Sequence, residues 1–259
     1  MSTHRSLEFS RRSLLLSAVP VAFSPLLGRA TAPENPPASS FPGQDPDMVK
    51  EMVVVSHGQI ARVKELVAKH QTLAKAAYDW GFGDWETAID AASHVGNREI
   101  AEFLLANGAR PTIFSAAMLG HLDAVKAYIA ASPGIQKIKG PHSITLLRHA
   151  MAGGAQAKPV LDYLKTVEGA DDRLPVQPLT ADDLAKLKGS YESGIVITVD
   201  REQLTFAAGG RTRGLAHLGS YEFYPAGAEH VRIRFDASAA AVTLTVHETG
   251  VVLTAKKTA

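Results

Sequence analysis

The chain has 259 residues, which is room for about two domains, and an apolar content of 46% that is ordinary for a globular protein. It has 27 basic and 26 acidic residues, so its net charge is +1. The basic residues form no long stripe along the sequence, which disfavours nucleic acid as a partner. The sequence contains no cysteine, which excludes disulfides, thiolate metal ligands and cysteine nucleophiles.

The N-terminus carries a pattern that is typical of bacterial export. Arg11 and Arg12 lie in the run Ser-Arg-Arg-Ser-Leu-Leu-Leu at residues 10–16. This run resembles the twin-arginine motif of bacterial proteins that are exported in a folded state. We therefore expect a periplasmic or secreted protein.

The export signal is expected to cover residues 1–30. The mildly apolar run at residues 14–27 is shorter than the about 20 residues that a stable membrane span needs. Small residues offer cleavage after Ala30 or Ala32, and the alternative is an uncleaved anchor. Residues 31–47 are rich in proline and predict a disordered linker.

The clearest motif of the chain lies at residues 111–126 and reads Pro-Thr-Ile-Phe-Ser-Ala-Ala-Met-Leu-Gly-His-Leu-Asp-Ala-Val-Lys. It resembles the first helix, tight turn and second helix of an ankyrin repeat, whose pattern runs T-P-L-H-x-A-A-x-x-G-H-x-x-x-V. An ankyrin unit cannot bury its apolar face alone, so one unit implies stacked neighbours. The resemblance implies an ankyrin-type α-solenoid of about four units over residues 48–166.

The expected turns of these units are marked by Gly58, Gly96, Gly120 and Gly154. Apolar residues recur three or four positions apart beside the turns, which predicts one apolar face on each helix. Gly96 and Gly120 can adopt the left-handed conformation that ends a helix. Pro111 suits the first turn of the third unit's first helix.

The spacing of the turn glycines predicts one missing and one enlarged connection. The intervals are 38, 24 and 34 residues, whereas the ankyrin period is about 33. The interval of 24 predicts that the second and third units lack the β-turn finger between them. The interval of 38 places an insertion at residues 69–86.

The insertion carries four aromatic side chains, Tyr78, Trp80, Phe82 and Trp85. Fingers of ankyrin stacks usually contact partners, and exposed aromatics dominate interface energies. These four are therefore candidate partner-binding residues. The alternative is that the rings cover the first unit. This alternative is favoured for Trp85, which adjoins a helix start, and is evenly balanced for Trp80.

The pattern changes after residue 166. Residues 167–180 form a polar, proline-bearing connector, at whose end Thr180 and Asp183 have the spacing of a capping box. Alternating apolar residues then predict strands at residues 195–199, 203–206, 231–235 and 242–246. We therefore expect an antiparallel β half-barrel of about six to eight strands over residues 181–259.

Four runs in this part resemble a known domain: Lys-Gly-Ser-Tyr at 188–191, Tyr-Glu-Phe-Tyr-Pro at 221–225, Ile-Arg-Phe-Asp at 233–236 and Val-His-Glu-Thr-Gly at 246–250. They are similar to a lipocalin-like domain that is often appended to penicillin-binding-protein-like serine hydrolases. That domain typically ends with an arginine near the position where Lys256 and Lys257 stand here, so this detail departs. A small barrel of this kind can bind an apolar ligand in its mouth.

No recognisable catalytic or phosphate-binding motif is present. No serine has a lysine three residues later, and the G-x-S-x-G elbow, the Walker loop and H-E-x-x-H are missing. The ten histidines include no pair four residues apart. We therefore expect no enzyme, no cofactor and no metal. His57, His94 and His121 lie at helix-ending turns, where a structural role is typical.

Five further polar residues of the β part are candidates for a site or for the surface. His217, His230 and His247 lie in three expected strands and could converge on a metal, although lone strand histidines are more often exposed. Arg211 and Arg213 are expected on a solvated hairpin.

The expected fold class is α + β in separate domains, with an N-terminal ankyrin-type α-solenoid and a C-terminal antiparallel β half-barrel. We interpret the chain as an exported, non-enzymatic protein–protein interaction module that uses its ankyrin surface. We expect a protein partner, no nucleic acid and no stable membrane span after signal cleavage. The alternatives are binding of a small ligand or lipid by the β domain, or an accessory subunit of a periplasmic hydrolase.

Overall fold

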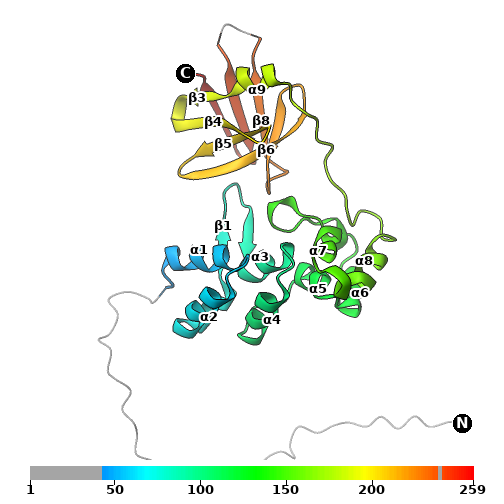
Figure 1. Ribbon diagram of the computed structural model, residues 1–259. Coiled ribbons are helices and arrows are strands. Elements are labelled where there is room, and N and C mark those ends of the chain that lie inside the picture. Colours follow the sequence, from blue (N-terminus) through cyan, green and yellow to red (C-terminus); the bar gives the residue numbers. More distant parts are fainter. Residues whose placement is uncertain (1–42, 239–240) are drawn as a thin grey trace, which may run out of the picture. The chain divides into compact units, whose positions relative to one another are not determined.

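The computed structural model describes residues 43–238 and 241–259. The expected export signal, with Arg11 and Arg12, and most of the expected linker therefore lie outside the described residues. The described chain holds a helical part followed by an antiparallel sheet, which confirms the expected division into α and β parts (Figure 1). None of the helices in this described part combines the length and apolarity that crossing a lipid bilayer would require.

The helical part is built from successive helix pairs, as the turn glycines predict. The first helices of the pairs are α1 (Pro46–Val55), α3 (Ala88–His94), α5 (Ile113–Leu119) and α7 (Leu146–Ala152). The second helices are α2 (Ile60–Lys69), α4 (Arg98–Ala106), α6 (Leu122–Ala131) and α8 (Lys158–Leu164). Helix α3 contacts both α1 and α5, and α5 contacts α7. Fully buried alanines such as Ala92 and Ala117 let neighbouring helices approach closely.

In three of the four pairs, the first helix begins at a threonine whose hydroxyl accepts a backbone N–H. These N-caps are Thr87 for α3, Thr112 for α5 and Thr145 for α7. The hydroxyls of Thr87 and Thr112 also donate to the carboxylate of Asp90, at 2.7 and 2.6 Å. The bond from Thr112 joins the second unit to the third. Because Thr112 is the N-cap of α5, the prediction that Pro111 lies in the first turn of that helix is wrong.

The turns at Gly96 and Gly120 have φ of 78° and 79°, which confirms the left-handed conformation expected there. A Cβ atom at Gly120 would lie 2.3 Å from the carbonyl oxygen of Gln156. Glycine is therefore required at Gly120 both by the turn and by the approach of the next unit.

The insertion forms a short helix and a hairpin. It contains the 3₁₀ helix η1 (Gln71–Lys75) and the antiparallel strands β1 (Ala77–Asp79) and β2 (Trp85–Thr87). We call the hairpin at residues 77–87 the finger. Residues 107–112, between α4 and α5, hold neither helix nor strand, which confirms the missing finger there.

Short 3₁₀ turns occupy other connections: η2 (Ile135–Lys137), η3 (Pro141–Ser143), η4 (Gly154–Ala157) and η5 (Glu192–Gly194). The connection that holds η2 and η3 joins α6 to α7, and it returns the chain toward the finger, because Asp84 bonds His142 of η3.

The C-terminal part begins with α9 (Ala181–Leu187), whose start at Thr180 and Asp183 is the expected capping box. Eight strands follow: β3 (Gly189–Tyr191), β4 (Ile195–Asp200), β5 (Gln203–Ala208), β6 (Arg211–Gly219), β7 (Glu222–Pro225), β8 (Arg232–Asp236), β9 (Thr243–Glu248) and β10 (Val251–Lys256). Each strand pairs antiparallel with the next one along the chain.

The two ends of this sheet meet. Tyr191 of β3 forms a bridge with Lys257, just after β10, so the sheet closes almost completely into a barrel. The expected half-barrel is therefore confirmed and is more closed than expected. Fully buried side chains including Phe223, Ile233 and Leu244 form its core, and burying each contributes about 1.5–3 kcal/mol.

Candidate functional site

The four aromatic side chains of the insertion have different surroundings. Tyr78 and Trp80 are partly buried against the core of the first units, with ring centroids 5.0 Å apart. Phe82 packs on the core of the barrel, with its ring centroid 5.7 Å from that of Phe206. Trp85 is 64% exposed, although the sequence favoured packing for it. Only the last of these rings is presented freely to a partner.

A groove of about 430 Å³ adjoins Trp85. Its other lining residues include Phe114, Lys139, Pro141 and Glu229. The groove therefore offers apolar rings beside a cation and an anion. This combination suits an extended protein segment that carries both apolar and charged side chains.

Four side chains from distant segments converge beside the finger. His57 follows α1, Glu86 lies on β2, His94 ends α3 and His142 lies in η3. One nitrogen or carboxylate oxygen of each side chain lies within 4.8 Å of those of the others. We call these four residues the histidine–glutamate cluster.

The carboxylate of Glu86 faces all three imidazoles, although this side chain has no exposed surface. Its Oε1 atom lies 2.9 Å from Nε2 of His94, 3.4 Å from Nε2 of His142 and 3.6 Å from Nε2 of His57. The Nε2 atoms of His57 and His94 are 3.1 Å apart. Three imidazole nitrogens and one carboxylate oxygen, each of which could ligate a metal ion, thus surround one point.

Asp84 orients one of these imidazoles. Its carboxylate accepts the backbone N–H of His142 at 2.9 Å and lies 2.8 Å from Nδ1 of the same residue. Nη2 of Arg213 donates to this carboxylate at 2.7 Å. The side chain of Asp84 is 2% exposed and that of Arg213 is 10% exposed. The expectation that Arg213 lies on a solvated hairpin is therefore wrong, because strand β6 directs it to a buried partner. Arg211, two residues earlier, is exposed as expected.

Two further contacts fix the cluster. The indole Nε1–H of Trp80 donates to Oε2 of Glu86 at 2.7 Å, leaving Oε1 free for the imidazoles. Nδ1 of His57 lies 3.2 and 3.0 Å from the carbonyl oxygens of Val53 and Val54, and it must carry a proton to bond them. In the neutral ring the lone pair on Nε2 then points into the cluster.

The electrostatics follow from these contacts. Burial raises the pKa of Glu86, but hydrogen bonds from His142 and His94 outweigh it and hold the pKa at about 2. Burial lowers the pKa of His142, but its hydrogen bonds to Asp84 and Glu86 outweigh that effect and raise the pKa to about 9. The cluster therefore contains a carboxylate that stays ionised over the physiological range.

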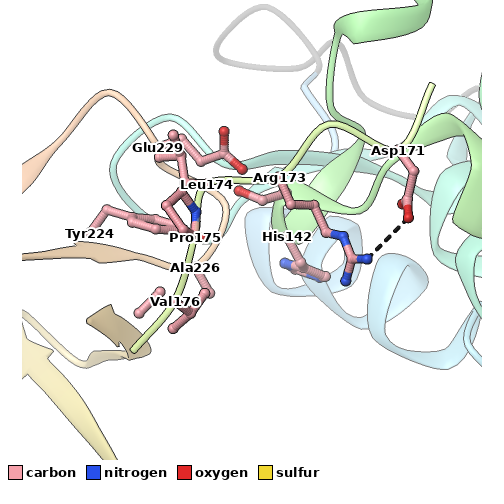
Figure 2. A pocket seen from close by; sticks show the side chains of 11 residues that line it. His142, Asp171, Arg173, Leu174, Pro175, Val176, Tyr224, Ala226 and Glu229 are labelled. Carbon is pink, nitrogen blue, oxygen red and sulfur yellow. Dashed lines mark hydrogen bonds and ion pairs between the residues drawn. The ribbon is translucent and has the colours of Figure 1, made fainter. Parts of the chain in front are cut away.

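A hollow of about 490 Å³ reaches His142. Figure 2 shows the side chains that line it. Its lining includes Arg173, which pairs with Asp171, and Tyr224 of the barrel. The side chain of His142 is 25% exposed, and that of His57 is 32% exposed. Small solutes can therefore reach the cluster, although Glu86 lies beneath its surface.

The histidines of the barrel are not brought together. His217 lies on β6 and stacks on Phe223, with centroids 4.8 Å apart, and His247 lies on β9. His230 lies in a turn and not in a strand. Across residues 43–238 and 241–259, the histidine–glutamate cluster is the group whose donor atoms could hold a metal, and it contains none of these three.

Sequence reasoning placed His57 and His94 correctly at helix-ending turns but did not join them to Glu86 or His142. A signal for two of them was present, because His57 stands one position and His94 two positions before a turn glycine of consecutive units, and nearly equivalent positions of stacked units are neighbours. His142 had no such signal, since it lies in a connection that no repeat position aligns.

One comparison with known proteins identifies part of the helical region. The family model of the ankyrin repeat matches residues 84–115, from the second strand of the finger to the middle of α5. The matched segment contains Glu86 and His94 of the cluster and the exposed Trp85. No curated protein matches the chain.

Proposed function

We propose that this chain is an exported, non-enzymatic module that binds a protein partner through its ankyrin-repeat part. The repeat match at residues 84–115 supports a role in protein–protein interaction. The observation that carries the more specific proposal is the exposed indole of Trp85 at the edge of a groove. An indole at the centre of an interface can contribute a large share of the binding energy.

The partner is proposed to be an extended segment of a protein. It places an apolar side chain between Trp85 and Phe114 and pairs its charges with Lys139 and Glu229. The proposal that the chain is exported rests on Arg11 and Arg12, whose motif would send the folded chain to the periplasm. The partner is therefore sought in the periplasm.

Photo-crosslinking tests the binding surface directly. A photoreactive phenylalanine analogue replaces Trp85 in one version and Val251 in a control version, and both are expressed in the producing bacterium. Val251 is a suitable control because it is 58% exposed but lies on β10. We expect one major protein adduct from position 85 and none from position 251.

The identified partner is then titrated against Trp85→Ala and Val251→Ala. We expect Trp85→Ala to weaken binding by at least about tenfold, as for an aromatic hot spot. Val251→Ala should bind as the parent does, and both should unfold within about 0.5 kcal/mol of it. Equal adducts from both positions, or unchanged binding by Trp85→Ala, would refute this surface.

A further inference from the structure

We propose that His57, Glu86, His94 and His142 bind one Zn²⁺ ion through three Nε2 atoms and one carboxylate oxygen. Imidazole nitrogen and carboxylate oxygen are common zinc ligands, and four such donors complete a tetrahedral site. The proposal concerns a site that is independent of the partner-binding surface.

The separations between the donor atoms fit such an ion. With zinc–ligand bonds of about 2.0–2.2 Å, the edges of a tetrahedron are about 3.3–3.6 Å long. The separations around Glu86 are 2.9, 3.4 and 3.6 Å, and that between His57 and His94 is 3.1 Å. The separations from His142 to the other two imidazoles are at most 4.8 Å, so an ion at the centre requires shifts of side chains that already face one another.

The surrounding hydrogen bonds are those that orient metal ligands. Histidine ligands usually bond their other ring nitrogen to a carboxylate or a backbone carbonyl, which fixes the tautomer. His142 does so with Asp84 at 2.8 Å, and His57 does so with two carbonyl oxygens. The bond from Trp80 holds the remaining oxygen of Glu86. Both inner and outer contacts of a zinc site are thus in place.

The atoms that face one another in the cluster are of the types that ligate metals. Nδ1 of His57 and Nδ1 of His142 are held by outer contacts, so Nε2 of each ring faces the oxygen of Glu86. Without a metal ion, protons join these atoms by hydrogen bonds, and a bound metal ion displaces the protons. A single divalent ion satisfies all four donor atoms at once, and zinc is the ion that three imidazoles and one carboxylate in tetrahedral geometry suit best.

The proposed ion has a structural role in the repeat stack. Its ligands come from the turn between α1 and α2 of the first unit, from the second unit and from the connection before the fourth pair of helices. Four protein ligands leave no coordination position for a substrate, as in structural zinc sites. The ion therefore crosslinks segments that are up to 85 residues apart, from His57 to His142.

Zinc titration tests the proposal. The full-length chain, purified without a histidine tag and stripped with EDTA, is titrated with zinc chloride, and bound zinc is measured by equilibrium dialysis with elemental analysis. His57→Gln is the safer ligand variant because His57 is the most exposed member of the cluster. Glu86→Gln is the second variant. His121→Gln is the matched control, since His121 also lies at a turn but is exposed and outside the cluster.

We expect the parent chain and His121→Gln to bind one zinc ion per chain, and the two ligand variants to bind at least about 100-fold more weakly. Zinc should also raise the thermal midpoint of the parent but not of His57→Gln. Circular dichroism confirms that each variant is folded, and if Glu86→Gln does not fold, His57→Gln decides alone.

Cobalt(II) provides a check of geometry. A tetrahedral site gives the intense visible absorption of four-coordinate cobalt, whereas loose surface binding gives the weak bands of six-coordinate cobalt. The proposal is overturned by six-coordinate spectra, by the lack of stoichiometric zinc binding in the parent, or by His57→Gln binding zinc as tightly as His121→Gln.

Discussion

The helical part and the barrel bury different kinds of side chain. Tyrosines aside, the buried polar and charged residues of the described chain all lie in the helical part: Ser56, Asp84, Glu86, Asp90, Ser93, Ser115, Thr145 and His149. The core of the barrel is formed by aliphatic and aromatic residues. The barrel therefore gains stability from apolar burial, whereas the helical part also depends on satisfied charges.

The difference teaches where a site can arise in this chain. A barrel core is made by adjacent strands whose alternate side chains face inward, so apolar residues suffice. The cluster beside the finger is made by a turn, a strand, a helix end and a 3₁₀ turn, whose polar groups require partners. The barrel contributes one charged side chain to this network, Arg213, which pairs with Asp84.

The largest expected effect comes from comparing two carboxylates that each contact two basic groups. Asp84 contacts His142 and Arg213 and is 2% exposed, whereas Glu222 of the barrel contacts Arg232 and Arg234 and is 28% exposed. Asp84→Ala leaves buried charges without a partner and should lower the free energy of unfolding by about 3–5 kcal/mol. Glu222→Ala should cost less than about 1 kcal/mol, because solvent screens its pairs.

Urea unfolding of both variants, followed by circular dichroism, measures this contrast. Added salt should lower the cost of Asp84→Ala only slightly, because buried charge pairs are poorly screened. If both substitutions cost the same, the stability of the helical part would not depend on charge pairing, and the comparison between the two parts would fail.

The next effect concerns His149, which has no exposed surface. Its Nδ1 bonds the carbonyl oxygen of Thr145 at 2.9 Å, and its Nε2 has no hydrogen-bond partner among the described residues. Burial lowers the pKa of His149 from 6.5 to about 4, because a proton on Nε2 would be both buried and unpaired.

The sign of the pH effect follows from this depressed pKa. The unfolded chain takes up a proton on His149 near pH 6.5, whereas the folded chain takes it up only near pH 4. The contribution to stability is therefore complete above about pH 6.5 and is lost as the pH falls toward 4, on the order of 3 kcal/mol.

His149→Gln isolates this contribution, since its amide can still donate to Thr145 but does not titrate. The free energy of unfolding is measured by urea at pH 7 and pH 4.5 for parent and variant. We expect the parent to lose more stability than the variant between these two values. Parallel losses would show that His149 is not held neutral by its surroundings.

Much of the fold was predictable because its signals are local. Turn glycines such as Gly96 and Gly120 and the apolar periodicity around them gave the helix pairs, and alternation gave most of the strands. The start of α5 differs from the prediction because two N-terminal signals compete there, and the hydroxyl of Thr112 rather than the ring of Pro111 begins the helix.

The candidate site was less predictable because its contacts are distant in sequence. The bond between Asp84 and Arg213 joins residues 129 positions apart. Arg211 and Arg213 are two positions apart and lie on the same side of β6. Nothing local distinguishes them, and Arg213 is the less exposed one because it alone reaches Asp84. The orientation of Trp85 likewise depends on how the finger pairs, with Tyr78 and Trp80 on the packed side.

The smallest contrast concerns two glycines that share a left-handed backbone. Gly120, in the helical part, has φ of 79°, and Gly209, in the hairpin between β5 and β6, has φ of 58°. An added Cβ at Gly120 meets the backbone oxygen of Gln156 at 2.3 Å, whereas an added Cβ at Gly209 meets no atom within 4 Å. Gly209→Ala should cost only the conformational strain, about 1 kcal/mol. Gly120→Ala should cost about 2 kcal/mol more, because the backbone of the next unit must move.

Thermal and urea unfolding of the two variants measure this difference in the free energy of unfolding. A loss at Gly120 no larger than that at Gly209 would mean that successive units do not approach as closely as described here, and the stacking that brings the cluster together would be in doubt.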